Sequence, residues 1–159
     1  MTDRVLYHYT SLGAARSAAE YGYIKRNPPL PPRYMDRRGL LPDVVYLTGD
    51  PLRSQQRWAG TPQHDVKGLA YLDRAAARIA CSLDPDLGAA ARRFRAWALD
   101  YNIPAAWIEE AAKGGRTDDW WVLEREVAKV EWIEVAFWNG LRYVPTFQRV
   151  LGRGGGASR

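Results

Sequence analysis

The stretch LYHYTS, residues 6–11, decides the fold, because a strand-forming run passes directly into the start of a helix. Side chains alternate between the two faces of a strand, so His8 is predicted on the face opposite Tyr7 and Tyr9. Free backbone N–H groups gather at a helix N-terminus, so a polar ring carried there by a strand indicates a ligand site. The alternative is that His8 is a structural residue whose hydrogen bonds are satisfied within the fold.

The rest of the chain alternates between short strands and helices. The opening strand is predicted over Val5–Tyr9, and Thr10 or Ser11 is expected to cap a helix that Gly22 ends. The β-branched and aromatic residues of Val44–Thr48 predict a second strand. The other predicted elements are the helix 12–21, an extended segment 23–25, a proline-rich loop 27–42, a short helix 52–58, a strand 78–83, a turn 84–86, a helix 89–100 with Phe94, Trp97 and Ala98 on its inner face, a helix 105–113, strands 119–127 and 132–138, and a hairpin turn at 139–140.

Length and composition predict one α+β domain over residues 1–150, followed by a flexible Gly- and Arg-rich tail at 151–159. Strands interleave irregularly with helices, which favours a mixed or antiparallel sheet. The 7 Trp and 9 Tyr are many for 159 residues, and they indicate a core or cleft with stacking surfaces. His64 lies in a polar loop, where a histidine is either exposed or catalytic.

The bulk properties exclude some classes of protein. A net charge of +5 favours partners that carry phosphate. The single cysteine, Cys81, excludes an internal disulfide framework and fits a reducing cytoplasm. With only 2 His and 1 Cys, no zinc site is expected. No apolar run reaches the ~20 residues needed to cross a bilayer, and no signal-peptide segment opens the chain, so a cytoplasmic protein without membrane contact is expected.

Glu124 and Glu126 form the second informative feature. In a continuous strand they share one face and lie about 6.6–6.8 Å apart. Two carboxylates on a mostly apolar strand are unfavourable unless something holds them, and partial burial raises the pKa of at least one. The alternative is a salt-bridged surface on an exposed edge strand.

Three separated signals combine: His8 in the first strand, Tyr46 in the second and a glutamate in a late strand. This order resembles the His-Tyr-Glu type of the ADP-ribosyltransferase superfamily. The stretches LYHYTS (6–11), VVYLT (44–48) and EREVAKVEWIEV (124–135) look like its motifs, and they are similar to DNA-targeting ADP-ribosyltransferase toxins and small bacterial or phage-borne relatives. The resemblance implies a split mixed or antiparallel sheet with flanking helices, and NAD as co-substrate.

The resemblance also implies roles for single residues. His8 would hydrogen-bond the ribose hydroxyls of NAD, and Tyr46 would stack on the nicotinamide. Glu126 would bind the nicotinamide-ribose 2′-OH and stabilise an oxocarbenium-like transition state. Glu124 would orient or deprotonate the acceptor, although relatives with this pair usually carry an arginine in the first strand. A β-bulge would shift the strand register and place Glu124 rather than Glu126 at the catalytic position. The residues implied in NAD binding are His8, Tyr9, Thr10, Ser11, Tyr46 and Thr48.

Three functions follow as hypotheses. The first is a mono-ADP-ribosyltransferase that modifies a protein or nucleic acid, as a toxin or in a phage–host conflict. The second keeps the fold but hydrolyses NAD or removes an RNA 2′-phosphate. The third is a basic nucleic-acid-binding module without catalysis, in which aromatic residues stack on bases. Its basic residues would be Arg33, Arg37, Arg38, Arg92, Arg93 and Arg95. The glutamate pair favours the enzyme readings, because a phosphate-binding face has no use for two carboxylates.

Overall fold

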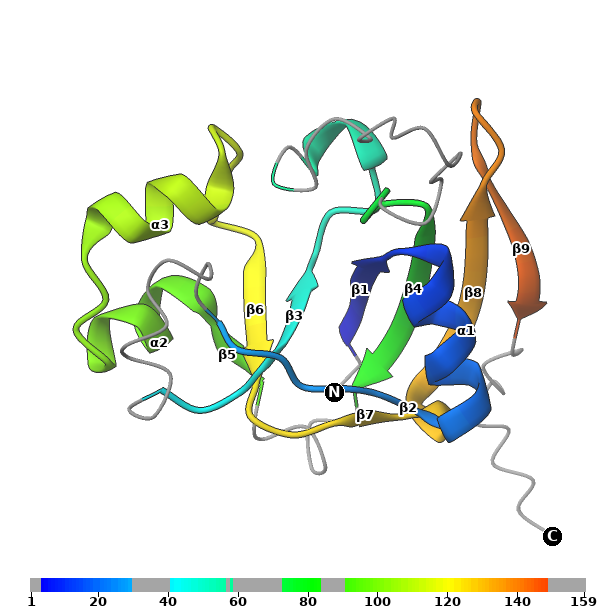
Figure 1. Ribbon diagram of the computed structural model, residues 1–159, viewed down its shortest axis with the longest axis horizontal. Helices are drawn as coiled ribbons and strands as arrows, with labels where there is room; N and C mark the ends of the chain where they lie inside the picture. The colour runs from blue at the N-terminus through cyan, green and yellow to red at the C-terminus, as the bar shows by residue number, and fades with distance from the viewer. Residues whose placement is uncertain (1–3, 30–40, 57, 59–72, 84–90, 149–159) are drawn as a thin grey trace, which may run out of the picture.

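The computed structural model describes residues 4–29, 41–56, 58, 73–83 and 91–148, and they form a single α+β domain (Figure 1). A seven-stranded antiparallel sheet and a two-stranded sheet are accompanied, within these residues, by three α-helices. Several predictions concern residues outside the described part of the chain: those for Arg33, Arg37, Arg38, His64, the turn at 84–86 and the tail 151–159.

The opening strand and helix form where the sequence predicts them. Strand β1 spans Arg4–Thr10 and helix α1 spans Leu12–Tyr21. The hydroxyl of Ser11 accepts a hydrogen bond from the backbone N–H of Ala14 at 3.2 Å, which makes Ser11 the N-cap. Gly22 ends the helix in the left-handed conformation at φ 85°, which a glycine adopts without steric cost.

The main sheet runs in the order β5-β6-β3-β1-β4-β8-β9, so the opening strand β1 lies at its centre. All its neighbouring strands pair antiparallel, which resolves the expectation of a mixed or antiparallel sheet. The remaining strands are β2 Tyr23–Ile24, β3 Val45–Thr48, β4 Ala77–Leu83, β5 Arg92–Arg93, β6 Trp120–Leu123, β7 Val127–Ala128, β8 Trp132–Trp138 and β9 Tyr143–Gln148. Strands β2 and β7 form the second sheet.

The two neighbours of β1 pair with it very differently. Strand β4 pairs along its whole length, from Arg4↔Leu83 to Thr10↔Ala77. Strand β3 shares one registered pair with β1, Tyr7↔Thr48. Beyond that pair the two strands part, so the sheet has an opening beside the middle of β1.

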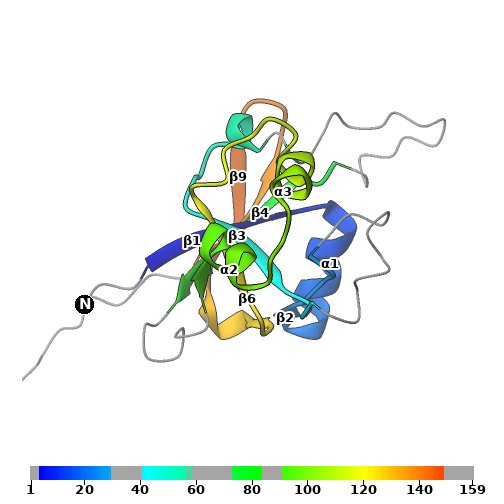
Figure 2. The same ribbon diagram turned by 90° about the vertical axis from the view of Figure 1, so that its left-hand side faces the viewer.

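Apolar residues pack on both faces of the sheet. On one face Leu6, Cys81 and Trp132 are buried together with Ala18 of α1. On the other, Val122 is buried with residues of helix α2, which spans Phe94–Asp100. Helix α3, Ala105–Ala112, follows α2, and both lie at the β6 end of the sheet, whereas α1 lies to one side (Figures 1 and 2).

Two predicted helices are shorter than the sequence indicates. The helix expected over 89–100 begins at Phe94, because Arg92 and Arg93 pair with strand β6 instead. Its predicted inner face is confirmed, since Phe94, Trp97 and Ala98 are buried. Of the helix expected over 52–58, the described residues form a 3₁₀ turn at Arg53–Gln55, and Trp58 is again in 3₁₀ conformation. Local propensity was outweighed in the first case by strand pairing, which depends on distant residues.

The strand predicted over 119–127 is wrong in its second half. Strand β6 ends at Leu123, and residues 124–126 form a bend before β7. The carboxylate of Glu124 accepts hydrogen bonds from Trp97 Nε1 at 2.8 Å and from the Tyr101 hydroxyl at 3.1 Å. The chain leaves the main sheet here and joins the small one, so Glu124 and Glu126 do not share a strand face.

The last two strands form a hairpin. Strand β8 occupies the predicted range 132–138, and it pairs with β9 from Trp138↔Tyr143 onward. The side-chain oxygen of Asn139 accepts hydrogen bonds from the N–H groups of Leu141 and Arg142, both at 2.9 Å. Gly140 adopts φ 100°, so the Asn-Gly signal for a turn is confirmed.

Candidate functional site

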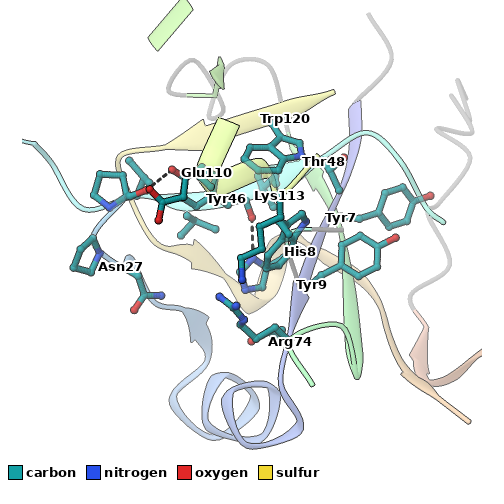
Figure 3. A pocket seen from close by; sticks show the side chains of 18 residues that line it. Tyr7, His8, Tyr9, Asn27, Tyr46, Thr48, Arg74, Glu110, Lys113 and Trp120 are labelled. Carbon is teal, nitrogen blue, oxygen red and sulfur yellow. Dashed lines mark hydrogen bonds between the residues drawn. The ribbon is translucent and has the colours of Figure 1, made fainter. Parts of the chain in front are cut away.

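A pocket of about 550 Å³ lies where β1 and β3 part (Figure 3). Both strands line it, together with the segment 27–29, the end of α3 and single residues from other loops. It is large enough to hold a small-molecule ligand of ordinary size. Four residues of the stretch 6–11, Tyr7 to Thr10, therefore line this pocket.

His8 lies in the lining with one ring nitrogen already bound. Its Nδ1 donates a hydrogen bond to the backbone carbonyl of Tyr46 at 2.8 Å, across the opening between the two strands. Because a carbonyl oxygen only accepts, the proton sits on Nδ1 and the lone pair on Nε2. Burial lowers the pKa of His8, and the bond to Tyr46 offsets this only in part, so the ring is neutral at neutral pH. Nε2 makes no hydrogen bond to the described residues and can accept one from a ligand hydroxyl.

Tyr46 presents its ring to the same pocket and is held at both ends. Its hydroxyl donates to the carbonyl of Pro29 at 2.7 Å. Its ring centroid lies 5.6 Å from that of Phe94 and 5.9 Å from that of Trp120. Burial raises the pKa of Tyr46, so the hydroxyl stays protonated. The ring is thus a fixed, uncharged surface rather than an acid or base.

Other aromatic side chains extend this surface. Trp58 and Trp120 both line the pocket, and their ring centroids are 6.5 Å apart in an edge arrangement. Tyr9 also lines it, with its hydroxyl donating to the carbonyl of Asp50 at 2.9 Å. Sequence reasoning did not select Trp58 or Trp120, although the high tryptophan content pointed to stacking surfaces of this kind.

Charged side chains stand at the rim. Arg74, Lys113 and Glu110 line the pocket, so cations outnumber carboxylates among the described residues of its lining (Figure 3). Arg74 and Lys113 form no ion pair with the described residues, whereas Arg53 and Arg78 elsewhere are both paired with carboxylates. A rim of this charge attracts an anionic ligand.

Lys113 is also unusual in its backbone. It closes α3 in the left-handed conformation, with φ 47° and ψ 44°, a position that glycine normally takes. Gly114 follows it at φ 79°. A lysine held in this conformation with its side chain on the pocket is consistent with strain retained at a functional position.

The NAD-binding residues implied by the resemblance are mostly brought together. His8, Tyr9, Thr10, Tyr46 and Thr48 all line the pocket. Ser11 does not, because its hydroxyl caps α1.

The two glutamates lie outside the pocket lining. Glu124 is bound to Trp97 and Tyr101, on the α2 side. Glu126 lies 3.5 Å from Arg26 Nε, and its side chain is 48% exposed. Sequence reasoning instead missed Glu110, which carried no local signal beyond its place in a predicted helix.

Within the described residues, no cluster of three or more His, Cys, Asp or Glu side chains is placed to hold a metal ion. No helix in the same part of the chain is long and apolar enough to cross a membrane. Comparisons with protein families, with curated proteins and with solved structures find no match for this chain.

Proposed function

We propose that the pocket binds NAD and that the protein is a mono-ADP-ribosyltransferase acting on a protein or nucleic-acid acceptor. The observation that carries the proposal is the pairing of His8 with Tyr46. A neutral imidazole, whose Nε2 makes no hydrogen bond to the residues that the structure describes, and an immobilised aromatic ring line one cavity from adjacent strands. The opening between β1 and β3 supports a sheet of the ADP-ribosyltransferase type.

Each part of NAD has a suitable partner in the pocket. The cationic nicotinamide ring matches the face of Tyr46. A ribose hydroxyl can donate to Nε2 of His8, which is an acceptor in this tautomer. The diphosphate matches the cations Arg74 and Lys113 at the rim. Trp58 and Trp120 offer further stacking surface for the adenine.

The reaction would break the bond between nicotinamide and ribose. Positive charge then develops on the ribose, as in glycoside cleavage, and nearby carboxylates lower the energy of that state. The surroundings of the pocket are apolar and aromatic, which strengthens such electrostatic effects.

The experiment that tests this is incubation with NAD labelled in its adenylate part. Label transfer is measured onto mixed protein, single-stranded DNA and RNA, and nicotinamide release is measured in parallel. Transfer to one acceptor class is expected, and its loss in His8→Ala ties it to the pocket. Nicotinamide release without transfer would identify NAD hydrolysis instead. If neither label transfer nor nicotinamide release is detected, the proposal is refuted.

A second candidate is a nucleic-acid-binding module that performs no catalysis. The placement of Glu124 and Glu126 away from the pocket lining favours it, as does the excess of cations at the rim. Such a module would bind single strands by stacking and phosphate contacts, with an affinity that falls steeply with salt. Binding of an oligonucleotide that NAD does not displace would favour this candidate.

A further inference from the structure

We infer that two arginines in contact with Trp121 bind the phosphate backbone of a single-stranded nucleic acid, at a surface outside the pocket. This arginine–tryptophan stack consists of Arg4 on β1, Arg93 on β5 and Trp121 on β6. The inference goes beyond the proposed functions, because it assigns a second binding surface and needs no NAD. Failure of the NAD chemistry would therefore leave it standing.

Two guanidinium groups share one indole ring in this stack. The Cζ atom of Arg4 lies 4.3 Å from the centroid of the Trp121 ring, and the Cζ atom of Arg93 lies 4.4 Å from it. Arg93 is the registered partner of Trp121 on the neighbouring strand, whereas Arg4 belongs to β1, on the far side of β3 in the sheet order. The two charges are at most twice 4.4 Å apart, so they repel one another.

The stack has no carboxylate of its own among the described residues. Arg93 donates a hydrogen bond to the backbone carbonyl of Asp118 at 2.8 Å, and within this part of the chain neither Arg93 nor Arg4 forms an ion pair. The carboxylate of Asp118 instead pairs with Arg95 at 3.1 Å and Arg116 at 4.0 Å. Arginines thus outnumber carboxylates beside the stack as well, and such a surplus attracts an anionic ligand.

The contact with the ring leaves the arginines able to bind oxygen atoms. A cation–π contact draws on the charge of a guanidinium, while its five N–H donors form a fixed fork that matches the oxygens of a phosphate. Arg4 and Arg93 are both exposed, so a phosphate reaches them from solvent. The indole holds the two groups in place, which lowers the entropy lost when they bind.

The spacing and the surroundings of the stack favour a single strand bound through its backbone. One strand carries a negative charge at every nucleotide, and its flexibility lets successive phosphates meet both arginines, whereas a duplex is stiff. Trp121 is half-buried against the cluster that contains Leu47, so its ring is not offered to a base. Trp120 lines the pocket, and successive side chains of a strand point to opposite faces, so the bound strand lies outside the pocket.

The test measures binding of a labelled oligo(dT) of about 15 nucleotides, by fluorescence anisotropy over a range of salt concentrations and without NAD. The double variant Arg4→Gln/Arg93→Gln is compared with Arg16→Gln/Arg142→Gln, which removes the same charge from two exposed arginines outside the stack and the pocket lining. For the first we expect the dissociation constant at low salt to rise at least ~10-fold and the salt slope to fall by about 1.4, since each phosphate contact on a single strand contributes about 0.7. The control should keep the wild-type slope.

The inference is overturned if wild type does not bind, or if the double variant binds like the control. Tighter binding of a duplex of the same length would exclude the single strand. A preference of more than ~10-fold between oligo(dT) and oligo(dA) would show that bases are read. Displacement by poly-glutamate at equal charge would assign the surface to an acidic protein instead.

Two further variants complete the test. If Arg74→Gln lowers the salt slope while the double variant does not, the strand is bound at the pocket rim and the inference is wrong. Should the double variant fail to fold, Arg4→Gln and Arg93→Gln are measured singly, and each should lower the slope by about 0.7. Unchanged slopes in both single variants would overturn the inference.

Discussion

His8 combines burial with one committed ring nitrogen, and this decides what it can do. The carbonyl of Tyr46 holds the Nδ1 proton, so the ring presents an acceptor at neutral pH. A protonated imidazole would have two donors and would repel the cationic nicotinamide. The structural and the ligand-binding interpretations of His8 are therefore compatible, because one nitrogen serves each.

The lowered pKa of His8 predicts a pH dependence of stability. The unfolded chain binds a proton near the ordinary histidine value of 6.5, whereas the folded protein does not until lower pH. Stability is therefore fully present above about pH 6.5 and falls as the pH drops below it. Between pH 7.5 and pH 5.5, the free energy of unfolding measured in urea should fall less for His8→Gln than for wild type. His64 is present in both proteins, so its contribution cancels in the comparison. An equal fall in the free energy of unfolding for the two proteins would contradict the prediction.

The hydroxyl of Tyr46 is predicted to matter for stability rather than for NAD affinity. Tyr46→Phe removes the donor to Pro29 and leaves that carbonyl unpaired, which should cost about 1–2 kcal/mol in the free energy of unfolding. The ring remains, so NAD affinity should stay within about threefold of wild type. Urea unfolding and tryptophan-fluorescence titration with NAD measure the two effects. Tyr21→Phe, at a residue 61% exposed, is the matched control and should be neutral.

At the scale of elements, helix α3 ends in a left-handed conformation at Lys113, a residue that lines the pocket. Lys113 occupies a left-handed position that glycine would take without steric cost. Nothing in the capping hydrogen bond to Glu109 requires a lysine, because the backbone N–H makes it.

Lys113→Gly should therefore be more stable and bind less tightly. Relief of the left-handed conformation, less the extra chain entropy of glycine, should raise the free energy of unfolding by up to about 1 kcal/mol. Loss of the cation should weaken NAD binding roughly tenfold, because a charge-assisted contact contributes about 1.4 kcal/mol, which corresponds to a tenfold change in affinity. Urea unfolding and fluorescence titration report the two quantities. Asn102→Gly, at φ 53° and outside the pocket lining, should leave the affinity unchanged, and a parallel fall there would refute the role of the lysine.

At the scale of the whole molecule, the central strands carry the core. Cys81 lies on β4, pairs opposite Leu6 of β1 and is fully buried. Burial, aided by the charge of Glu131, raises the pKa of the Cys81 thiol. The thiol thus lacks both the access and the ionisation that reaction with a labelling reagent needs.

Labelling of Cys81 should accordingly report global unfolding. The thiol should be protected from a disulfide reagent in buffer and should react as urea exposes it, with the same midpoint as tryptophan fluorescence. Cys81 is the single cysteine, so the signal is unambiguous. Rapid labelling without urea would show that β4 opens separately from the rest of the sheet.

Sequence reasoning worked best where the signal was local. Ser11 and Gly22 mark the ends of α1 through capping chemistry that needs only neighbouring residues. It failed over residues 124–126, where an alternating pattern suggested one strand. The bonds from Trp97 and Tyr101 to Glu124, which accompany the bend, join residues more than 20 positions apart, and no local pattern encodes them.

The sequence by itself determined the α+β class, the ends of α1 and the turn at Asn139-Gly140, because capping and turn chemistry act over a few residues. The pairing of His8 with Tyr46 was implied by the resemblance to the ADP-ribosyltransferase superfamily, and both residues line the pocket. Only the tertiary structure decided that β1 and β3 share a single pair, that the opening beside them is a pocket, and that Glu110 rather than Glu124 or Glu126 lines it. The physical reason is that a cavity exists where packing between distant segments leaves space, and its lining is chosen by that packing rather than by any one stretch of chain.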